Sequence, residues 1–198
     1  LPMPIKKIRP VTIGQRNISV QDFSDVTTDK PEKSLIISRK NKAGRNGGKI
    51  AVRHQGGGHK KFIREVDFTR SRYDIPATVK SVEYDPNRGA RISLVTYKDG
   101  VKSYVLTPDG MKVGDVIVSS LTEAEILPGN RLPLQKIPVG TTIHSVELAP
   151  GKGGQLGHGA GSRIEFMAIE DDFAVIKLPS GETRRVPKGC MATIGSVS

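Results

Sequence analysis

The 198-residue sequence contains no tryptophan, five phenylalanines, four tyrosines and a single cysteine. One cysteine, Cys190, excludes an intramolecular disulfide and a zinc site built from several cysteines. We expect it to pack as a small apolar residue near a strand. Scarce aromatic side chains argue against a protein that stacks single-stranded nucleic acid on aromatic platforms. No apolar run approaches the roughly 18 residues of a membrane-spanning helix, so we expect no membrane partner.

Groups that could perform catalysis or bind a metal ion are also scarce. His54 and His59 are the only close pair of candidate ligands, and without a nearby cysteine they make a poor zinc site. His144 lies in a strand-like segment, where we expect a hydrogen-bonded structural role. Four aspartates lie at expected turns, where Asp satisfies backbone groups: Asp85, Asp99, Asp109 and Asp115. The sequence predicts no enzyme active site, no metal site, no cofactor and no small-molecule substrate.

Two glycine-rich tracts invite comparison with nucleotide-binding loops, and both fail it. The tract Gly44-Arg-Asn-Gly-Gly-Lys49 has the wrong spacing for a P-loop, and Ile50 stands where a Mg²⁺-binding Ser or Thr is required. In residues 150–161 the third glycine of a dinucleotide fingerprint falls at Ser162, and no βαβ pattern follows. For this second tract, two interpretations stay open: a flexible loop that contacts an RNA backbone, or a plain loop between strands.

Acidic residues are absent from residues 33–64, which hold ten Lys or Arg together with six Gly and two His. A segment with charge of one sign repels itself and builds no packed core, whereas opposite a polyanion it neutralises phosphates and releases counterions. Glycines let backbone N–H groups approach phosphate oxygens closely. A tail kept basic for solubility is the alternative, but it would not require interleaved glycines and histidines. The segment therefore predicts nucleic-acid binding.

The positive charge is confined to the first third of the chain. Residues 1–72 hold 17 Lys or Arg against 6 Asp or Glu, and residues 73–198 hold 14 against 14. Residues 1–61 lack periodicity apart from a short apolar run at 35–37, and they read as an extended basic arm. Short Val- and Ile-rich runs follow, separated by Gly and Pro turns, with a breaker cluster at 128–130 as the boundary between two units.

The expected strands cover residues 62–68, 77–84, 91–97, 102–106 and 113–118, and then 142–148, 163–169, 173–178 and 183–186. The apolar phase slips between Val79 and Val82, which indicates a bulge. Hairpin turns are expected at 98–100 and 179–181. Strands of this length and spacing predict an all-β protein made of two small barrels.

Five motifs then occur in order: Arg53-His-Gln-Gly-Gly-Gly-His-Lys60, Glu83-Tyr-Asp-Pro-Asn-Arg88, Asn130-Arg-Leu-Pro-Leu134 with Ile137-Pro-Val-Gly140, Pro150-Gly-Lys-Gly-Gly-Gln-Leu156 and Ala192-Thr-Ile-Gly195. Over nearly its full length the chain resembles the bacterial-type large-subunit ribosomal protein L2 family. The resemblance implies a basic arm at 1–61 buried in large-subunit rRNA, an OB-fold RNA-binding barrel at 62–129 and an SH3-like barrel at 130–198. It also implies roles in subunit assembly, in subunit association and in support of the peptidyl-transferase region.

The resemblance carries RNA contacts over to Arg53, His54, His59, Lys60, Arg70, Arg88, Lys152 and Gln155. The charge pattern adds further candidates in the basic tract and at turns: Lys40, Lys42, Arg45, Lys49, Lys61, Arg64, Arg72 and Arg91. An ordinary exposed turn arginine is the alternative for each of the latter two and for Arg70 and Arg88. His158 is a further candidate for RNA contact. The resemblance places it where the family has an RNA-contacting arginine, and an imidazole is mostly uncharged at neutral pH.

Two further departures concern the basic tract and the ends of the chain. The tract at 44–49 is one residue shorter than in the family, and the sequence stops before the family's C-terminal extension. Two alternatives stay open: the chain has a mainly structural and assembly-related role, or a separate chain supplies the missing extension. The family usually begins at the position of Met3, so Leu1 and Pro2 suggest a processed precursor. These ends favour an organellar ribosome, a mitochondrion rather than a plastid, with the bacterial cytoplasm as the alternative.

The partners expected are therefore large-subunit rRNA and neighbouring ribosomal proteins, with any structural Mg²⁺ bound through the rRNA. Two other functions stay open at this point: an RNA-binding or RNA-chaperone module outside the ribosome, and an enzyme that acts on RNA. The second lacks any combination of catalytic groups in the sequence.

Overall fold

The computed structural model describes residues 5–38, 44–56 and 58–198, and these form sixteen β-strands and three short 3-10 turns but no α-helix. No helix in this part of the chain is long and apolar enough to cross a membrane. The elements before the first barrel are β1 (Ile5–Lys7), β2 (Ser19–Gln21), β3 (Ile36–Ser38), β4 (Arg45–Asn46), β5 (Lys49–Ile50) and β6 (Phe62–Arg64), with 3-10 turns at Ile13–Gln15 and Lys33–Leu35.

The first barrel is built on a four-stranded antiparallel sheet in the order β10-β7-β8-β9. Its strands are β7 (Ala77–Glu83), β8 (Ile92–Tyr97), β9 (Lys102–Leu106) and β10 (Val116–Ile117). The register shifts between Val79 and Ser81, which confirms the bulge expected from the apolar phase. Tyr97 N–H donates to Val101 O (2.9 Å), and so the expected hairpin turn is confirmed.

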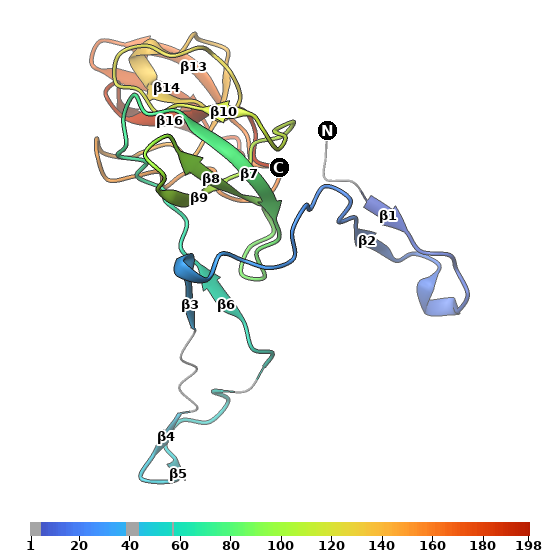
Figure 1. Cartoon of the computed structure of the whole chain (residues 1–198). Helices are drawn as coiled ribbons and strands as arrows, with labels where there is room; N and C mark the ends of the chain where they lie inside the picture. Colours follow the sequence, from blue (N-terminus) through green and yellow to red (C-terminus); the bar gives the residue numbers. More distant parts are fainter. Residues whose placement is uncertain (1–4, 39–43, 57) are drawn as a thin grey trace.

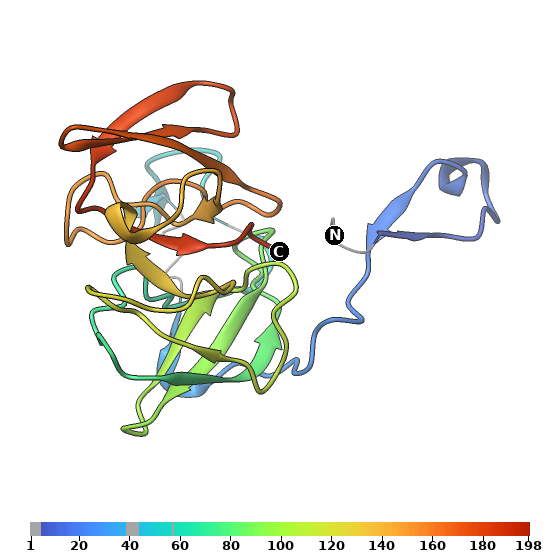
Figure 2. The same ribbon diagram turned by 90° about the horizontal axis from the view of Figure 1, so that it is seen from above.

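The second barrel is built on a six-stranded sheet in the order β11-β16-β12-β13-β14-β15. Its strands are β11 (Arg131–Pro133), β12 (Thr142–His144), β13 (Ile164–Glu170), β14 (Phe173–Lys177), β15 (Thr183–Pro187) and β16 (Met191–Ile194), with a 3-10 turn at Leu134–Lys136. One apolar cluster fills it and includes the fully buried Cys190, as expected. The two barrels lie against each other (Figure 2). The expected all-β class, an OB-fold barrel followed by an SH3-like barrel, is confirmed.

Several strands differ from the sequence expectation. The strand expected at 142–148 ends at His144, because Ser145 has a positive φ of 49° that turns the chain. The strand expected at 62–68 is only β6, followed by an isolated bridge between Val66 and Tyr104. We did not expect β11 or β16. Every residue of both is buried, so neither shows the alternation that marks a half-buried strand.

The arm is less independent than its sequence suggests. β3 pairs with β6, and Thr27 exchanges hydrogen bonds with the backbone of Val82 in β7. Residues up to 38 are thus partly fastened to the first barrel. In contrast, the β1–β2 ribbon projects to one side of the barrels, and β4–β5 lies beyond the β3–β6 ribbon (Figure 1).

The C-terminal residues return to the first barrel. Val197 is buried in an apolar cluster with Tyr104 and Leu106, and Ser198 N–H donates to Thr107 O (2.9 Å). We nevertheless propose to keep the division at residue 129, because β10 belongs to the first sheet and β11 to the second. The two barrels therefore share a contact that crosses this division.

Candidate nucleic-acid interface

The first candidate region is the ribbon formed by β4 and β5. Its two-residue turn is Gly47-Gly48, and both glycines have positive φ, as the primed hairpin turns require. At its base the carbonyl of Gly44 accepts hydrogen bonds from Ala51 N–H (2.8 Å) and Val52 N–H (2.9 Å). Gly44 has a positive φ, and a Cβ there would collide with the Val52 carbonyl oxygen. The tract that fails as a P-loop is therefore a hairpin.

The basic side chains on and after this ribbon have no acidic partner among the described residues. Each is exposed, and none forms an ion pair with another described residue: Arg45, Lys49, Arg53, His54, His59, Lys60 and Lys61. Lys60 lies over the ring of Phe62, with 5.3 Å from Nζ to the centroid. Two further candidates, Lys40 and Lys42, lie outside the described residues. The tip of the arm thus presents uncompensated positive charge to solvent.

The second candidate region is the glycine-rich loop that follows β12, and a buried glutamate holds it. Glu147 is 1% exposed, and its carboxylate accepts four hydrogen bonds. Arg131 Nη2 (2.8 Å) and Gly153 N–H (3.1 Å) donate to Oε1, and Gly151 N–H and Met191 N–H (both 3.1 Å) donate to Oε2. The carboxylate therefore joins the loop to β11 and β16.

The same loop is fastened to the first barrel. Gly154 N–H donates to Phe68 O (2.9 Å), and Gly153 packs against the backbone of Phe68 and the side chain of Thr69. Both glycines are buried, whereas Lys152 and Gln155 beside them are exposed. Of the two interpretations, a flexible loop does not fit these contacts, because the structure shows the loop held at both ends. Its glycines serve close packing, and its two polar side chains face outward as a consequence.

This packing gives a testable prediction for Gly154→Ala. An added Cβ would lie 2.6 Å from the carbonyl oxygen of Ser145, so the backbone must shift. We expect a loss of about 1–3 kcal/mol in the free energy of unfolding, the usual cost of overpacking. Gly159→Ala in the same loop is the control, because its Cβ would meet only the Ser162 hydroxyl at 3.1 Å. Equal losses for the two variants in urea denaturation would contradict this account.

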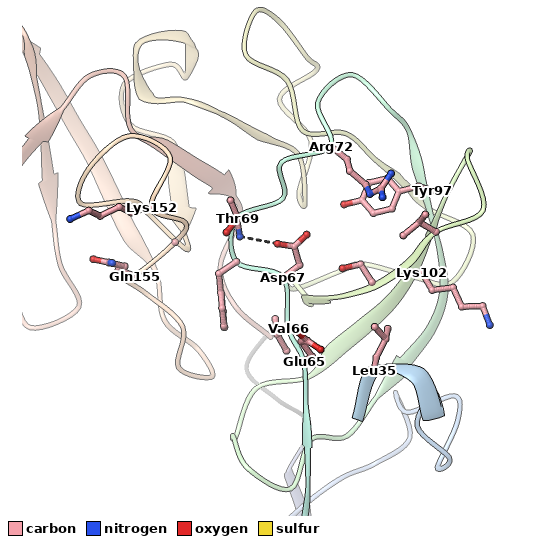
Figure 3. Close-up of a pocket in the computed structure, with 14 residues that line it drawn as sticks. Leu35, Glu65, Val66, Asp67, Thr69, Arg72, Tyr97, Lys102, Lys152 and Gln155 are labelled. Atoms are coloured by element: carbon pink, nitrogen blue, oxygen red, sulfur yellow. Dashed lines mark hydrogen bonds between the residues drawn. The ribbon is translucent and has the colours of Figure 1, made fainter. Parts of the chain in front are cut away.

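A groove of about 650 Å³ lies between the loop and the first barrel (Figure 3). Lys152 and Gln155 flank it on one side, and Arg72 and Lys102 flank it on the other. Asp67 lies between them, where its carboxylate accepts from the backbone N–H of the two residues 69 and 70 (2.9 and 2.8 Å). At the edges Arg72 pairs with Asp99 and Lys102 pairs with Glu32, whereas Lys152 forms no ion pair with another described residue. Asp67 and Glu65 add negative charge to the lining.

Arg88 and His158 contact the same aromatic ring. The Arg88 guanidinium lies 5.6 Å from the centroid of Phe68, and the His158 imidazole stacks on that ring with centroids 4.4 Å apart. Arg88 Nε also donates to the buried Asp85 (2.7 Å), which confirms the expected turn at 85–88. Burial, and then the charges of Arg88 and Arg131, lower the pKa of His158. His158 is therefore mostly neutral at pH 7, and it is half-buried.

Three arginines predicted to contact RNA are instead buried and bound to protein groups. Arg91 is fully buried, and its guanidinium donates to both carboxylate oxygens of Asp25 (2.9 and 3.0 Å). Arg70 is 4% exposed and donates to Gly129 O (2.8 Å), and burial lowers its pKa to about 10. Arg64 is 8% exposed and donates to a backbone carbonyl. The guanidinium groups of these three arginines bind groups of the protein interior, and RNA contact by them stays a prediction.

The partly exposed Arg72 remains a candidate, although it pairs with Asp99 and lies over the ring of Tyr97. His144 has the expected structural role: it is 1% exposed, and its Nδ1 donates to Gly195 O (2.8 Å). No three His, Cys, Asp or Glu side chains in the described part of the chain gather closely enough to hold a metal ion.

Sequence reasoning missed the residues that shape the interface from within. Glu147 lies within the strand expected at 142–148, and Arg131 lies in a motif that carries the family resemblance, so neither indicated a buried pair. An acidic residue close before a glycine-rich loop is a usable signal, because a carboxylate can accept several backbone N–H groups at once. Asp25 likewise gave no local sign that it binds Arg91.

Comparison with protein families matches both halves of the chain. A family model described as "Ribosomal Proteins L2, RNA binding N-terminal domain" matches residues 32–119. A second, "Ribosomal Proteins L2, C-terminal domain", matches residues 127–198. The chain belongs to the ribosomal protein L2 family. It is accordingly a protein of the large ribosomal subunit that binds RNA and lies among other ribosomal proteins, and L2 proteins are structural constituents of the ribosome.

Proposed function

We propose that this L2-family chain anchors large-subunit rRNA through the basic tip of its arm and through the edges of the inter-barrel groove. The observation that carries the proposal is the set of exposed, unpaired basic side chains between Arg45 and Lys61. The described residues near this tip include no acidic side chain that could neutralise them. Phosphates supply the missing negative charge, and counterion release favours their binding.

The barrels have a different part in this proposal. They carry no net charge as formally counted over residues 73–198, so they position side chains rather than attract RNA over distance. Lys152, Gln155 and Arg72 would contact a backbone that follows the edges of the groove. Asp67 in its centre would repel phosphates, so the strand stays at the edges. Arg88, at the turn of residues 85–88, would add a further contact with the RNA backbone.

We further propose that the tip orders on rRNA and so links the chain to subunit assembly. Every described residue from 45 to 61 is exposed, and a two-stranded ribbon without a packed face is marginal alone in water. Ordering on binding couples the shape of the tip to the shape of the rRNA. We propose that the same anchoring also supports subunit association and the peptidyl-transferase region.

Sedimentation after salt washing tests the anchoring. We expect the chain to stay with the large subunit at salt concentrations that release loosely held RNA-binding proteins. The reason is that the arm neutralises many phosphates while the barrels add further contacts to the rRNA. Recovery wholly in the soluble fraction would favour an RNA-binding or chaperone role outside the ribosome. RNA turnover by the purified protein that a point mutation abolishes would instead indicate an enzyme.

A second prediction concerns the double variant Arg53→Ala with Lys60→Ala. We expect weaker binding to an rRNA fragment and a log–log salt dependence that is flatter by about one to two, one for each lost phosphate contact. The control is Lys177→Ala with Arg185→Ala, which removes the same charge from side chains that pair with Glu165 and Glu170. An unchanged slope for the first variant would show that its two residues do not contact phosphate.

A further inference from the structure

One surface of this basic chain has the opposite character. Residues 113–130 contain no Lys or Arg, in a chain with 31 of them, and include three acidic residues. Of these, Glu123 and Glu125 are exposed and form no ion pair with another described residue. The carboxylate of Asp115 accepts from Lys112 N–H (2.7 Å) and is also exposed. This surface repels RNA, because phosphates would meet like charge there.

The same surface is apolar. Five side chains within it are between 41% and 53% exposed: Val113, Val116, Leu121, Ile126 and Leu127. A hollow of about 270 Å³ lies among Met111, Val116, Leu127 and Pro128, with Asp115 at its edge. Its lining shares no residue with the groove between the barrels. Exposed apolar side chains that alternate with exposed acidic ones along one segment are typical of a protein-binding surface.

Hydrogen bonds hold this surface in shape. Ser120 N–H donates to Arg131 O (3.0 Å), which closes the loop between β10 and β11. The side chain of Asn130 spans the loop, since it accepts from Val118 N–H (2.8 Å) and donates to Glu125 O (2.9 Å). Ala124 packs against the core of the second barrel. A loop already ordered in this way loses little conformational entropy when a partner binds.

We propose that residues 113–128, with Gly110 and Met111 of the hollow, are a docking surface for a basic segment of a neighbouring large-subunit protein, one that also carries an exposed apolar side chain. Lys112 is the exposed cation at the edge of this surface. Lys or Arg of that segment would pair with Glu123, Glu125 and Asp115, and its apolar side chain would enter the hollow beside Leu127. Charge complementarity selects this partner over rRNA. The inference rests on the assignment of the chain to the large subunit.

Photo-crosslinking from intact large subunits tests the docking surface. p-Benzoylphenylalanine is placed at Leu121, which is exposed and does not line the hollow, and in a separate control at Val139, which is 56% exposed on the second barrel. We expect the first position to give an adduct with a peptide of net positive charge from another large-subunit protein. An adduct with rRNA, or none at all, would overturn the proposal.

Charge reversal supplies the second arm of the test. With the crosslinker at Leu121, Glu123→Lys together with Glu125→Lys should lower the yield of that adduct by about tenfold or more. Glu165→Lys with Glu182→Lys makes the same charge change on the second barrel and should leave the yield unchanged. An equal loss in both would exclude a docking role for the two loop glutamates. Absence of the unsubstituted chain from large subunits would be a different failure, that of the ribosomal assignment itself.

Discussion

Glu147→Leu is expected to lower the free energy of unfolding by about 3–5 kcal/mol, the cost of removing one partner from a buried ion pair. The variant leaves Arg131 fully buried with no carboxylate. Two guanidinium nitrogens of Arg131, Nε and Nη1, already have no hydrogen-bond partner among the described residues, so the variant leaves the whole buried charge without an acceptor from Glu147. The N–H groups of Gly151, Gly153 and Met191 also lose their acceptor.

Urea denaturation measures this effect, and an exposed pair supplies the control. Glu165 and Lys177 are 3.4 Å apart and about half exposed, so Glu165→Leu should cost no more than about 1 kcal/mol. Glu147→Gln keeps the shape and one acceptor oxygen, and it should lie between the two. A loss for Glu147→Leu no larger than for Glu165→Leu would mean that the carboxylate does not organise the glycine-rich loop.

The stability of the folded chain is expected to fall by roughly 3 kcal/mol as the pH drops from about 7 to 4, through the titration of His144. Burial is the main cause of its low pKa, which is about 4 instead of 6.5, and Arg70 lowers it further. The hydrogen bond to Gly195 O acts in the opposite direction. Because the unfolded chain takes up a proton below pH 6.5 and the folded chain does not, acid favours unfolding throughout this interval.

The variant His144→Asn isolates this contribution. An Asn amide can still donate to the carbonyl of Gly195 but does not titrate in this range. We expect the difference in free energy of unfolding between the natural chain and this variant to shrink as the pH falls from 7 to 4. Urea denaturation at several pH values measures it. A difference that stays constant over this interval would show that His144 is not held neutral by the fold.

The fold could be predicted from the sequence wherever one face of a strand is buried. The hairpin around Asp99 and the bulge after Val79 follow from alternation and turn residues, which act over a few neighbouring positions. β11 and β16 lacked such a signal, because both are buried along their whole length. The hairpin at Gly47-Gly48 also has a local signal, because two consecutive glycines are typical of a two-residue hairpin turn.

For some candidate RNA contacts, the sequence position predicts an exposed side chain and the structure shows a buried one. Arg91 and Arg70 lie near turns, where an arginine is usually exposed, yet each is buried by a segment distant in sequence. Asp25 reaches Arg91 from 66 residues away, and Gly129 reaches Arg70 from 59 residues away. Local patterns carry no information about such partners. The tip residues, such as Arg53, are exposed and bind no distant partner among the described residues, and RNA contact by them stays a prediction.

The sequence by itself determined the class of partner and the separation of charge. An acid-free basic tract and two near-neutral β units follow from composition and periodicity, whatever the final packing. Only the tertiary structure decided which cations remain free to bind RNA and which serve the interior, since burial and pairing join residues far apart along the chain. It also decided the shape of the glycine-rich loop, because Glu147 fixes that loop through groups on two other strands.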